Sequence, residues 1–382
     1  MRVLYAQKRL HPNSWGIAEG LQRRGHDVVM LVHVPGSGRP GLDPVVVPYY
    51  RPFFRVLSGK TQHRWAIPRL GTLIRVFREC RPDVVVLKKG RLASQIVRVA
   101  GVLFRSQRVL LSDHVLHADE LPLLKRLAQR ILKPGCAIHT GVHDRGRDGQ
   151  ALDDVPTGVG RRRSRLIPYP VPQTAGASES PEFEAGDRDA TRPVGLIFVG
   201  SFSSSRKRPE WLVEAIARAG LSDRVTMTFV GSGGPSSPGI ARIREAERRH
   251  GLPASTIHAD LPWSEVQSLY TQHDLFVLPA RDEPYGAVVG EAMMAGLPVI
   301  CSDTCGSQSA LEDGVHGLVF DSDSVDDLAR SVGALVADPD RLQQMAKNAH
   351  QRATALLSPE GWAAEFERFI QDCGRADASA TD

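Results

Sequence analysis

The feature that most constrains the fold of this chain is a regular alternation of short apolar runs with helical stretches, which occurs in two series. The first series begins with an apolar run at residues 2–6 and a helical stretch at 14–24, and it continues to about residue 140. The second begins at residue 194 and includes the apolar runs 274–278 and 298–302. Because buried strands that alternate with helices form parallel sheets covered on both faces, each series predicts a doubly wound, Rossmann-like α/β domain.

A polar segment separates the two series. From residue 161 the chain changes from Arg-rich to rich in Pro, Ser, Ala and acidic residues, which is typical of a linker. Two such domains that face each other place a ligand cleft at the carboxyl ends of both sheets. We therefore predict the following organisation: a first domain at 1–172, a linker at 173–193, a second domain at 194–357, and a final helix with a frayed tail at 358–382.

The composition is that of an ordinary globular protein, with 42% hydrophobic and 24% charged residues among 382. The chain has no apolar run of 18 residues, and its start lacks the apolar core of a signal peptide, so we expect a cytoplasmic protein. The five cysteines are an odd number without metal-ligand spacing. We therefore expect them to be reduced and structural.

The charge is distributed unevenly. Residues 1–170 hold 30 Lys and Arg against 12 Asp and Glu, whereas the remaining residues hold 18 against 31. A basic half of this kind indicates an anionic partner, such as the inner face of a membrane or a lipid diphosphate. A solvated arginine-rich surface explains the same charge equally well. We do not expect nucleic acid as the partner.

The most specific chemical signal lies between Asp274 and Asp303. The apolar residues 275–278 predict a buried strand, and residues 287–295 predict a helix that ends at Gly296. Glu283 lies in the loop between them, and Glu291 follows eight positions later, within the helix. The two carboxylates therefore flank the start of a helix that opens at the carboxyl end of a strand.

This arrangement suits an anionic ligand that carries hydroxyl groups. The amides at the start of a helix lack intrahelical acceptors and favour a phosphate. The carboxylates of Glu283 and Glu291 accept hydrogen bonds from sugar hydroxyls. The residues that supply the predicted amides are Tyr285, Gly286, Ala287 and Val288. A plain strand-helix-strand unit with two solvated glutamates is the alternative interpretation.

The same block resembles the E-x7-E signature of retaining glycosyltransferases of the two-Rossmann (GT-B), family-four type, also known as glycosyl transferases group 1. The residues in register with that signature are Pro279, Ala280, Glu283, Pro284, Tyr285, Gly286, Glu291, Ala292, Ala295, Gly296, Pro298, Val299 and Ile300. The resemblance implies that the second domain holds a nucleotide-sugar donor, with Glu283 on the sugar and Glu291 on the ribose. It also implies that the C-terminal helix crosses back to the first domain.

The loop after the apolar run 194–199 resembles the family's diphosphate-binding loop. The resemblance implies that Gly200 and Lys207 bind the donor, with Lys207 facing the diphosphate. Ser201 stands where the family usually has arginine, so Arg206 is a second candidate for the same charge. A solvated Arg-Lys-Arg run is the structural alternative.

In the first domain the family resemblance implies a histidine near the donor sugar, and His114 is the best match. A surface histidine without a function is the alternative. The first strand-helix loop, where the family usually carries paired glycines, offers Asn13, Ser14 and Gly16 as acceptor-binding residues.

Two lookalikes of other sites are set aside. Asp321-Ser322-Asp323 resembles a metal-binding D-x-D motif, but its position after an apolar run predicts a turn and a helix cap. Gly231-Ser232-Gly233-Gly234 departs from the spacing of dinucleotide loops. It resembles instead the family's G-x-G-P turn, which implies a position near the donor's base or ribose, and a structural turn is the alternative. We therefore expect neither a metal nor a cofactor beyond the co-substrate.

The resemblance implies a transferase that moves a sugar from a nucleotide-diphosphate-sugar donor to a hydroxyl acceptor with retention. The basic first domain indicates a glycan or lipid-linked acceptor, as in cell-surface polysaccharide or glycolipid synthesis. Two alternatives stay open: a sugar-nucleotide epimerase or phosphorylase on the same fold, and a non-catalytic anion-binding protein.

Overall fold

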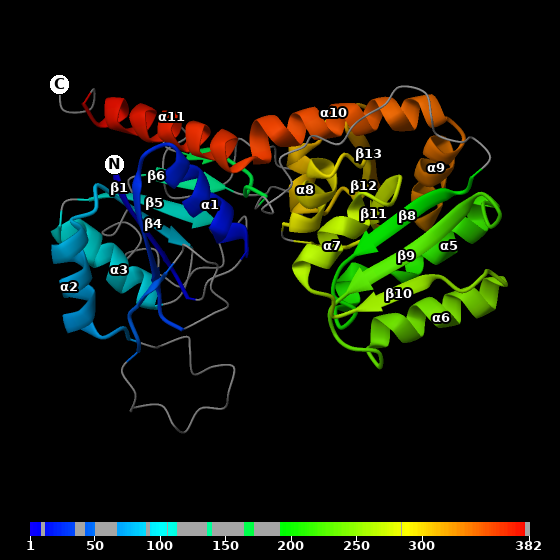
Figure 1. Cartoon of the computed structure of the whole chain (residues 1–382), viewed down its shortest axis with the longest axis horizontal. Coiled ribbons are helices and arrows are strands. Elements are labelled where there is room, and N and C mark those ends of the chain that lie inside the picture. The colour runs from blue at the N-terminus through cyan, green and yellow to red at the C-terminus, as the bar shows by residue number, and fades with distance from the viewer. Residues whose placement is uncertain are drawn as a thin grey trace. The chain divides into compact units, whose positions relative to one another are not determined.

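The computed structural model describes residues 1–8, 12–34, 43–49, 67–88, 92–104, 106–112, 136–139, 164–171, 192–283 and 285–378 (Figure 1). These residues form two compact units. Unit 1 contains the described residues up to 171 and takes up the chain again at Ser358, whereas unit 2 contains residues 192–357.

Unit 1 is built on a parallel sheet with the strand order β3-β2-β1-β4-β5-β6-β7. Strand β1 lies between β2 and β4 and forms parallel pairs with both. These three largely apolar strands form the centre of the sheet. The strands of unit 1 are β1 (Arg2–Gln7), β2 (Asp27–Val32), β3 (Val45–Val46), β4 (Val84–Lys88), β5 (Gln107–Ser112), β6 (Cys136–His139) and β7 (Ser164–Leu166); its helices are α1 (Pro12–Arg23), α2 (Leu70–Cys80), α3 (Leu92–Leu103) and α11 (Pro359–Ala378).

Unit 2 is built on a parallel sheet with the order β10-β9-β8-β11-β12-β13. Because the order reverses direction at β8, helices cover both faces: α5 packs with α6 and α9, and α8 packs with α10. The elements of unit 2 are β8 (Val194–Val199), η4 (Ser205–Lys207), α5 (Glu210–Ala219), β9 (Val225–Gly231), α6 (Pro238–His250), β10 (Thr256–Ala259), α7 (Trp263–Tyr270), β11 (Leu275–Leu278), α8 (Ala287–Met294), β12 (Val299–Ser302), η5 (Gly306–Ala310), β13 (Gly317–Phe320), α9 (Val325–Val336) and α10 (Pro339–Leu357).

The predicted fold class is confirmed: both units are doubly wound α/β structures, and the final helix returns to the first. Strand β7 lies within the predicted first domain at 1–172 and pairs with β6. Helix α3 was not predicted, although Val97 and Ala100, both buried, are spaced as on one face of a helix.

Helix α11 packs against α1 within unit 1, and Figure 1 shows the two side by side. Gly20 permits this contact, since a Cβ atom there would lie 1.9 Å from the carbonyl oxygen of Pro359. At the other end of the contact Arg24 and His26 both bind Glu367, at 2.6 and 2.7 Å. The hydrogen bond from Arg24, supported by His26, lowers the pKa of Glu367 to about 2.

The docking of α11 also changes the expected state of the cysteines. Cys136 of β6 and Cys373 of α11 form a disulfide, with Cα atoms 6.6 Å apart. The expectation that all five cysteines are reduced was therefore wrong. The two residues are 237 positions apart in sequence, so only the return of α11 to unit 1 brings them together. Cys80, Cys301 and Cys305 are free thiols.

Candidate functional site

A cavity of about 500 Å³ opens at the carboxyl edge of the sheet of unit 2. Its walls come from the loops that follow β8, β9, β10 and β11, and from the first turn of α8. Because parallel strands end at the same edge, residues from four distant parts of the sequence meet there. The lining residues are Val199, Gly200, Ser201, Lys207, Val230, Gly231, Ser232, Asp260, Leu261, Val266, Glu283, Gly286, Ala287 and Val288.

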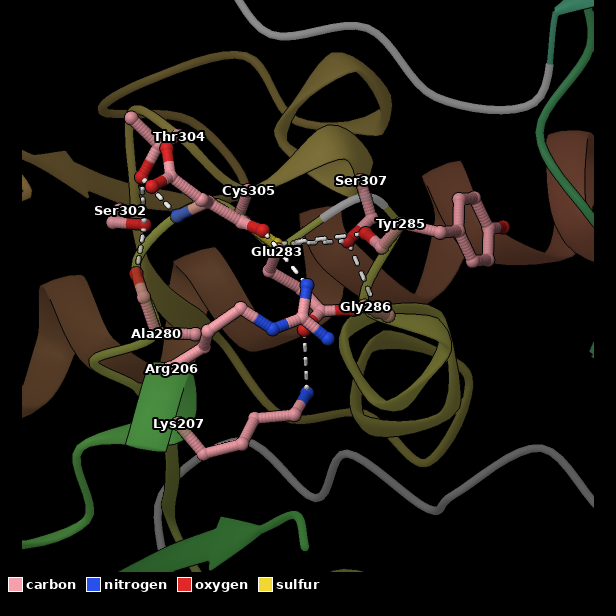
Figure 2. Close-up of polar contacts among 11 residues, drawn as sticks. Arg206, Lys207, Ala280, Glu283, Tyr285, Gly286, Ser302, Thr304, Cys305 and Ser307 are labelled. Atoms are coloured by element: carbon pink, nitrogen blue, oxygen red, sulfur yellow. Dashed lines mark hydrogen bonds and ion pairs between the residues drawn. The ribbon is translucent and has the colours of Figure 1, made fainter. Parts of the chain in front are cut away.

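Two of the lining residues, Lys207 and Glu283, form an ion pair. The Nζ atom of Lys207 lies 3.1 Å from Oε2 of Glu283, and the two side chains are only 13% and 12% exposed. Figure 2 shows the side chains pointing toward each other, with the ring of Tyr285 directed away from them. This end of the cavity therefore offers a cation, a carboxylate and the start of a helix within one small space.

Hydrogen bonds to the chain of the β11–α8 loop hold η4 in place. The backbone N–H of Arg281 donates to the carbonyl of Arg206 at 2.8 Å. The Arg206 guanidinium donates to the carbonyl of Asp282 at 3.0 Å, and Figure 2 shows this guanidinium contact. Arg208 donates to the carbonyls of Pro279 and Ser322, at 3.0 and 2.8 Å. These contacts place Lys207 in the cavity, whereas the Arg206 side chain binds the backbone of the β11–α8 loop.

The loop that follows β12 holds the start of α8 through several hydrogen bonds. Gly286 has φ +80°, and a Cβ atom there would lie 2.8 Å from Sγ of Cys305, so only glycine fits. Ser307 donates its N–H to the carbonyl of Tyr285 at 2.7 Å and its hydroxyl to the carbonyl of Gly286 at 2.9 Å (Figure 2). The backbone N–H of Gly306 donates to the carbonyl of Glu283 at 2.9 Å. The helix start and the glutamate loop are thus one rigid piece.

Small residues keep the opposite wall of the cavity close to the sheet. A Cβ atom at Gly200 would lie 2.8 Å from the ring of Phe198 and 3.3 Å from Cδ of Lys207, so glycine leaves room for the lysine stem. Asp260 follows β10 with φ +56°, and its Oδ1 accepts the N–H of Gly233 at 3.0 Å. This end of the cavity is mostly backbone and small side chains.

Glu291 lies on α8, one helical turn beyond the lining residues Ala287 and Val288. Its Oε2 accepts hydrogen bonds from the hydroxyl of Tyr270 at 3.2 Å and from the amide of Gln267 at 3.5 Å. Burial raises the pKa of Glu291, and its hydrogen bonds oppose that rise. The carboxylate is therefore oriented by α7 and does not itself line the cavity.

The structure divides the predicted donor-binding residues into two groups. Those that line the cavity are Gly200, Lys207, Glu283, Gly286, Ala287 and Val288. Those that lie beside it are Arg206, Tyr285 and Glu291. Asp260, Leu261 and Val266 also line the cavity, and none of them was among the predicted donor-binding residues.

The predicted acceptor residues Asn13, Ser14 and Gly16 lie in unit 1. His114, the predicted catalytic histidine, is outside the described residues. The amide of Gln7 donates to the hydroxyl of Ser14 at 2.7 Å, and both side chains are buried. A Cβ atom at Gly16 would lie 3.0 Å from Cγ of Pro170, so this glycine permits close packing. Asn13 belongs to the first turn of α1.

The D-x-D lookalike forms a turn, as predicted: the N–H of Asp323 donates to Oδ1 of Asp321, and Ser324 caps α9 by accepting from the N–H of Asp327. In the described part of the chain no group of three or more His, Cys, Asp and Glu is arranged to hold a metal ion.

Comparisons with known proteins match both halves of the chain. A family model described as Glycosyl transferases group 1 matches residues 182–352, and one described as Glycosyl transferase 4-like domain matches residues 13–142. Among curated proteins, the D-inositol 3-phosphate glycosyltransferase of Nocardia farcinica is 30% identical over 190 residues, which is 50% of this chain and 35% of that protein. That of Geodermatophilus obscurus is 30% identical over 216 residues, which is 52% of this chain and 45% of that protein. The chain thus spans less than half the length of these relatives.

Solved structures share the fold over almost the whole chain. The Anabaena protein Alr3699/HepE, in complex with UDP and glucose, has a TM-score of 0.67 at 15% identity, covering 97% of this chain and 99% of that one. The sucrose-phosphate synthase of Thermosynechococcus elongatus has a TM-score of 0.65 at 18% identity, covering 98% and 99%. WaaG, a glycosyltransferase involved in lipopolysaccharide biosynthesis, has a TM-score of 0.58 at 20% identity, covering 94% and 98%.

Proposed function

Because this chain belongs to the glycosyl transferases of group 1, we propose that it transfers a sugar from a nucleotide-diphosphate-sugar donor to a hydroxyl acceptor. The observation that carries the proposal is the cavity of unit 2, in which Lys207, Glu283 and the start of α8 meet. Anabaena Alr3699/HepE has been solved with UDP-glucose, which supports a nucleotide sugar as the ligand.

The proposed binding mode follows the charges of the cavity. The diphosphate binds Lys207 and the amides of Gly286, Ala287 and Val288, because a cation and a helix start both favour negative charge. Glu283 accepts hydrogen bonds from the sugar hydroxyls. The nucleoside extends toward Ser232 and Asp260, with its ribose next to α8 and Glu291.

In the proposed reaction the bond between the sugar C1 and the diphosphate oxygen breaks, and its electron pair leaves on the diphosphate. The acceptor hydroxyl bonds to C1 and loses its proton to the released diphosphate. Because negative charge grows on the leaving group, Lys207 and the helix amides stabilise the transition state more than the ground state. We propose that these groups make a metal unnecessary and that the anomeric configuration is retained.

His114 and the loop with Asn13, Ser14 and Gly16 complete the proposed machinery, with the loop on the acceptor side. His114 would donate a hydrogen bond to the donor sugar, a role that stays a prediction. The Ser14 hydroxyl is already bound to Gln7 in a buried contact. We therefore propose that this loop recognises the acceptor through its backbone and not through the Ser14 side chain.

The direct test is a product assay with a panel of UDP-, GDP- and ADP-sugars. A ligand that binds only the folded protein raises its melting temperature, so a thermal screen identifies the donor first. Release of nucleoside diphosphate together with a glycosylated acceptor supports the transferase, and an excess of chelator should leave the rate unchanged. Interconversion of the nucleotide sugar alone, or release of a sugar phosphate, would contradict it. The product's anomeric coupling constant tests retention.

We propose in addition that unit 1 contacts an anionic membrane on its cytoplasmic face, where a lipid-linked acceptor would be found. The support is the outer surface of α2. Leu70 and Ile74 are 44% and 41% exposed, and the exposed Arg75 and Arg78 lie beside them. Apolar side chains with neighbouring arginines suit the interface of an anionic bilayer. No helix in the described part of the chain is long and apolar enough to span a membrane.

Vesicle sedimentation tests this contact. The protein should bind vesicles with phosphatidylglycerol more tightly than pure phosphatidylcholine, and the double variant Leu70→Ser, Ile74→Ser should bind them several-fold more weakly. Arg248→Gln, at an exposed position of α6 in unit 2, is the matched control. Equal binding by the double variant and the wild type would contradict the proposed surface.

A further inference from the structure

One face of α7 carries three hydrogen-bond donors that converge on a single carboxylate. Trp263, Gln267 and Tyr270 are spaced by four and three positions, so they lie on the same side of the helix. Tyr270 and Gln267 both donate to Oε2 of Glu291. Trp263 contributes an indole N–H that favours the same charged group, although among the described residues it has no well-aligned acceptor.

Tyr270 is the most constrained of the three donors. Its side chain is 0% exposed, and its ring packs against Phe276 with centroids 6.0 Å apart. Burial and the nearby Glu291 carboxylate raise the pKa of Tyr270 well above its usual value. The phenol therefore stays protonated at physiological pH and serves as a fixed donor to Glu291.

The position of Glu291 makes this orientation matter for a ligand. Glu291 is four positions beyond Ala287 and three beyond Val288, and both of these line the cavity, so it lies on their face of α8. Val266, which also lines the cavity, is on α7 between the donors. The hydrogen bonds from Tyr270 and Gln267 both end on Oε2, so neither of these two donors binds Oε1.

We propose that Tyr270 is a positioning residue for the nucleotide, which holds Glu291 so that Oε1 accepts hydrogen bonds from the ribose hydroxyls. The inference rests on the proposed function, because it assumes a nucleotide in the cavity. It assigns to α7 a part in donor recognition that does not require contact between α7 and the ribose.

The hydrogen bonds from α7 also set the pH range of the interaction. Burial raises the pKa of Glu291, while Tyr270, Trp263 and Gln267 favour its charged form. From α10, which packs on α8, His350 is directed to the carbonyl of Met294. Removal of the Tyr270 hydroxyl should therefore raise the pKa of Glu291 further. When the pH is lowered, the variant should then lose nucleotide affinity at a higher pH than the wild type does.

The experiment compares a ligand that has a ribose with one that lacks it. UDP, GDP and ADP are titrated into the wild type by calorimetry, and the best binder is compared with inorganic pyrophosphate in Tyr270→Phe. Phenylalanine keeps the packed ring and removes only the hydroxyl. We expect the nucleotide Kd to rise about tenfold, the loss typical of one hydrogen bond to a charged group. The pyrophosphate Kd should change less than twofold.

A double-mutant cycle with Glu291→Gln shows whether Tyr270 acts through the carboxylate. In the Glu291→Gln background, Tyr270→Phe should cost little further nucleotide affinity. Equal losses for nucleotide and pyrophosphate, an unchanged nucleotide Kd, or a full tenfold loss in the Glu291→Gln background would each overturn the inference. If the wild type binds none of the three nucleotides, the proposed function itself is wrong, which is a distinct result.

Discussion

The two units share a strand order but differ in the residues that connect the first strand of each sheet to the first helix. Strands β3-β2-β1-β4-β5-β6 of unit 1 correspond in order to β10-β9-β8-β11-β12-β13 of unit 2. After β1, Gln7 and Ser14 bind each other in a buried contact. After β8, Gly200 leaves space and Lys207 enters a cavity. A common fold thus sets where a site can form, and the loop residues decide whether one does.

The difference arises from how each loop is held. In unit 2 the loop after β8 is anchored by Arg206 and Arg208 to backbone carbonyls, which leaves the side chain between them directed into the cavity. In unit 1 the described residues at this position include Gln7 and Ser14, which are joined by a buried hydrogen bond. Charged groups in unit 1 gather instead at the contact with α11, where Glu367 meets Arg24 and His26. Four variants test this contrast.

The largest expected effect is that of Lys207→Met. The substitution keeps the length of the side chain and removes the charge that we place on the diphosphate. Loss of one such group typically lowers turnover by roughly 10²–10³-fold, and pyrophosphate affinity should fall with it. Arg206→Met, measured in the same assays, is the control and should have a far smaller effect. If the two variants were equally impaired, the assignment of Lys207 alone to the cavity would be wrong.

The next effect concerns the brace between α1 and α11. Gly20→Ala places a methyl group against the backbone of Pro359, and overpacking of this kind costs about 2–3 kcal/mol. Thermal unfolding followed by tryptophan fluorescence, to which Trp15 and Trp362 of unit 1 contribute, measures the loss. Gly71→Ala in α2 is the matched control, because a Cβ atom there meets nothing within 4 Å. A melting temperature unchanged by Gly20→Ala would show that α11 does not need this close approach.

Ser14→Ala should have a smaller effect, confined to stability. The substitution leaves the buried amide of Gln7 without its acceptor and costs about 1–2 kcal/mol. Nucleotide affinity should not change, since the hydroxyl belongs to unit 1's internal contacts. Gln344→Ala, at an exposed position of α10, serves as a control for the loss of a solvated hydrogen bond to Asn348. Reduced nucleotide binding by Ser14→Ala would remove the contrast between the loops.

The smallest effect is the pH-dependent contribution of Glu367. Its pKa is lowered to about 2 in the folded state, below that of an unfolded glutamate, so its contribution is present above about pH 5 and lost as the pH falls toward 2. Because Arg24 is 39% exposed, solvent screening limits the gain to roughly 1 kcal/mol.

Glu367→Gln should therefore lower stability at pH 7 and approach the wild type as the pH falls to about 2, as measured by chemical denaturation across that range. Glu245→Gln, at an exposed position of α6, is the control and should change stability little at either pH. A constant difference between Glu367→Gln and the wild type at every pH would show that the carboxylate charge is not the cause.

The sequence by itself determined the class of fold and the family. Apolar runs such as 275–278 and 194–199 predicted buried strands with the observed bounds, because burial on both faces of a parallel sheet requires uninterrupted apolar residues. The E-x7-E pattern indicated the family. Gly286 within it has a positive φ that favours glycine, so this local backbone conformation is visible in the sequence.

Tertiary structure alone decided the direction of individual side chains. Neighbouring positions 206 and 207 carry similar charges, and only the carbonyl of Asp282 shows which of them turns away from the cavity. The contacts of Tyr270 with Glu291 and of Cys136 with Cys373 join distant positions that no local pattern links. The physical reason is that backbone conformation follows from near neighbours, whereas the partner of a buried polar group depends on which elements the whole fold packs together.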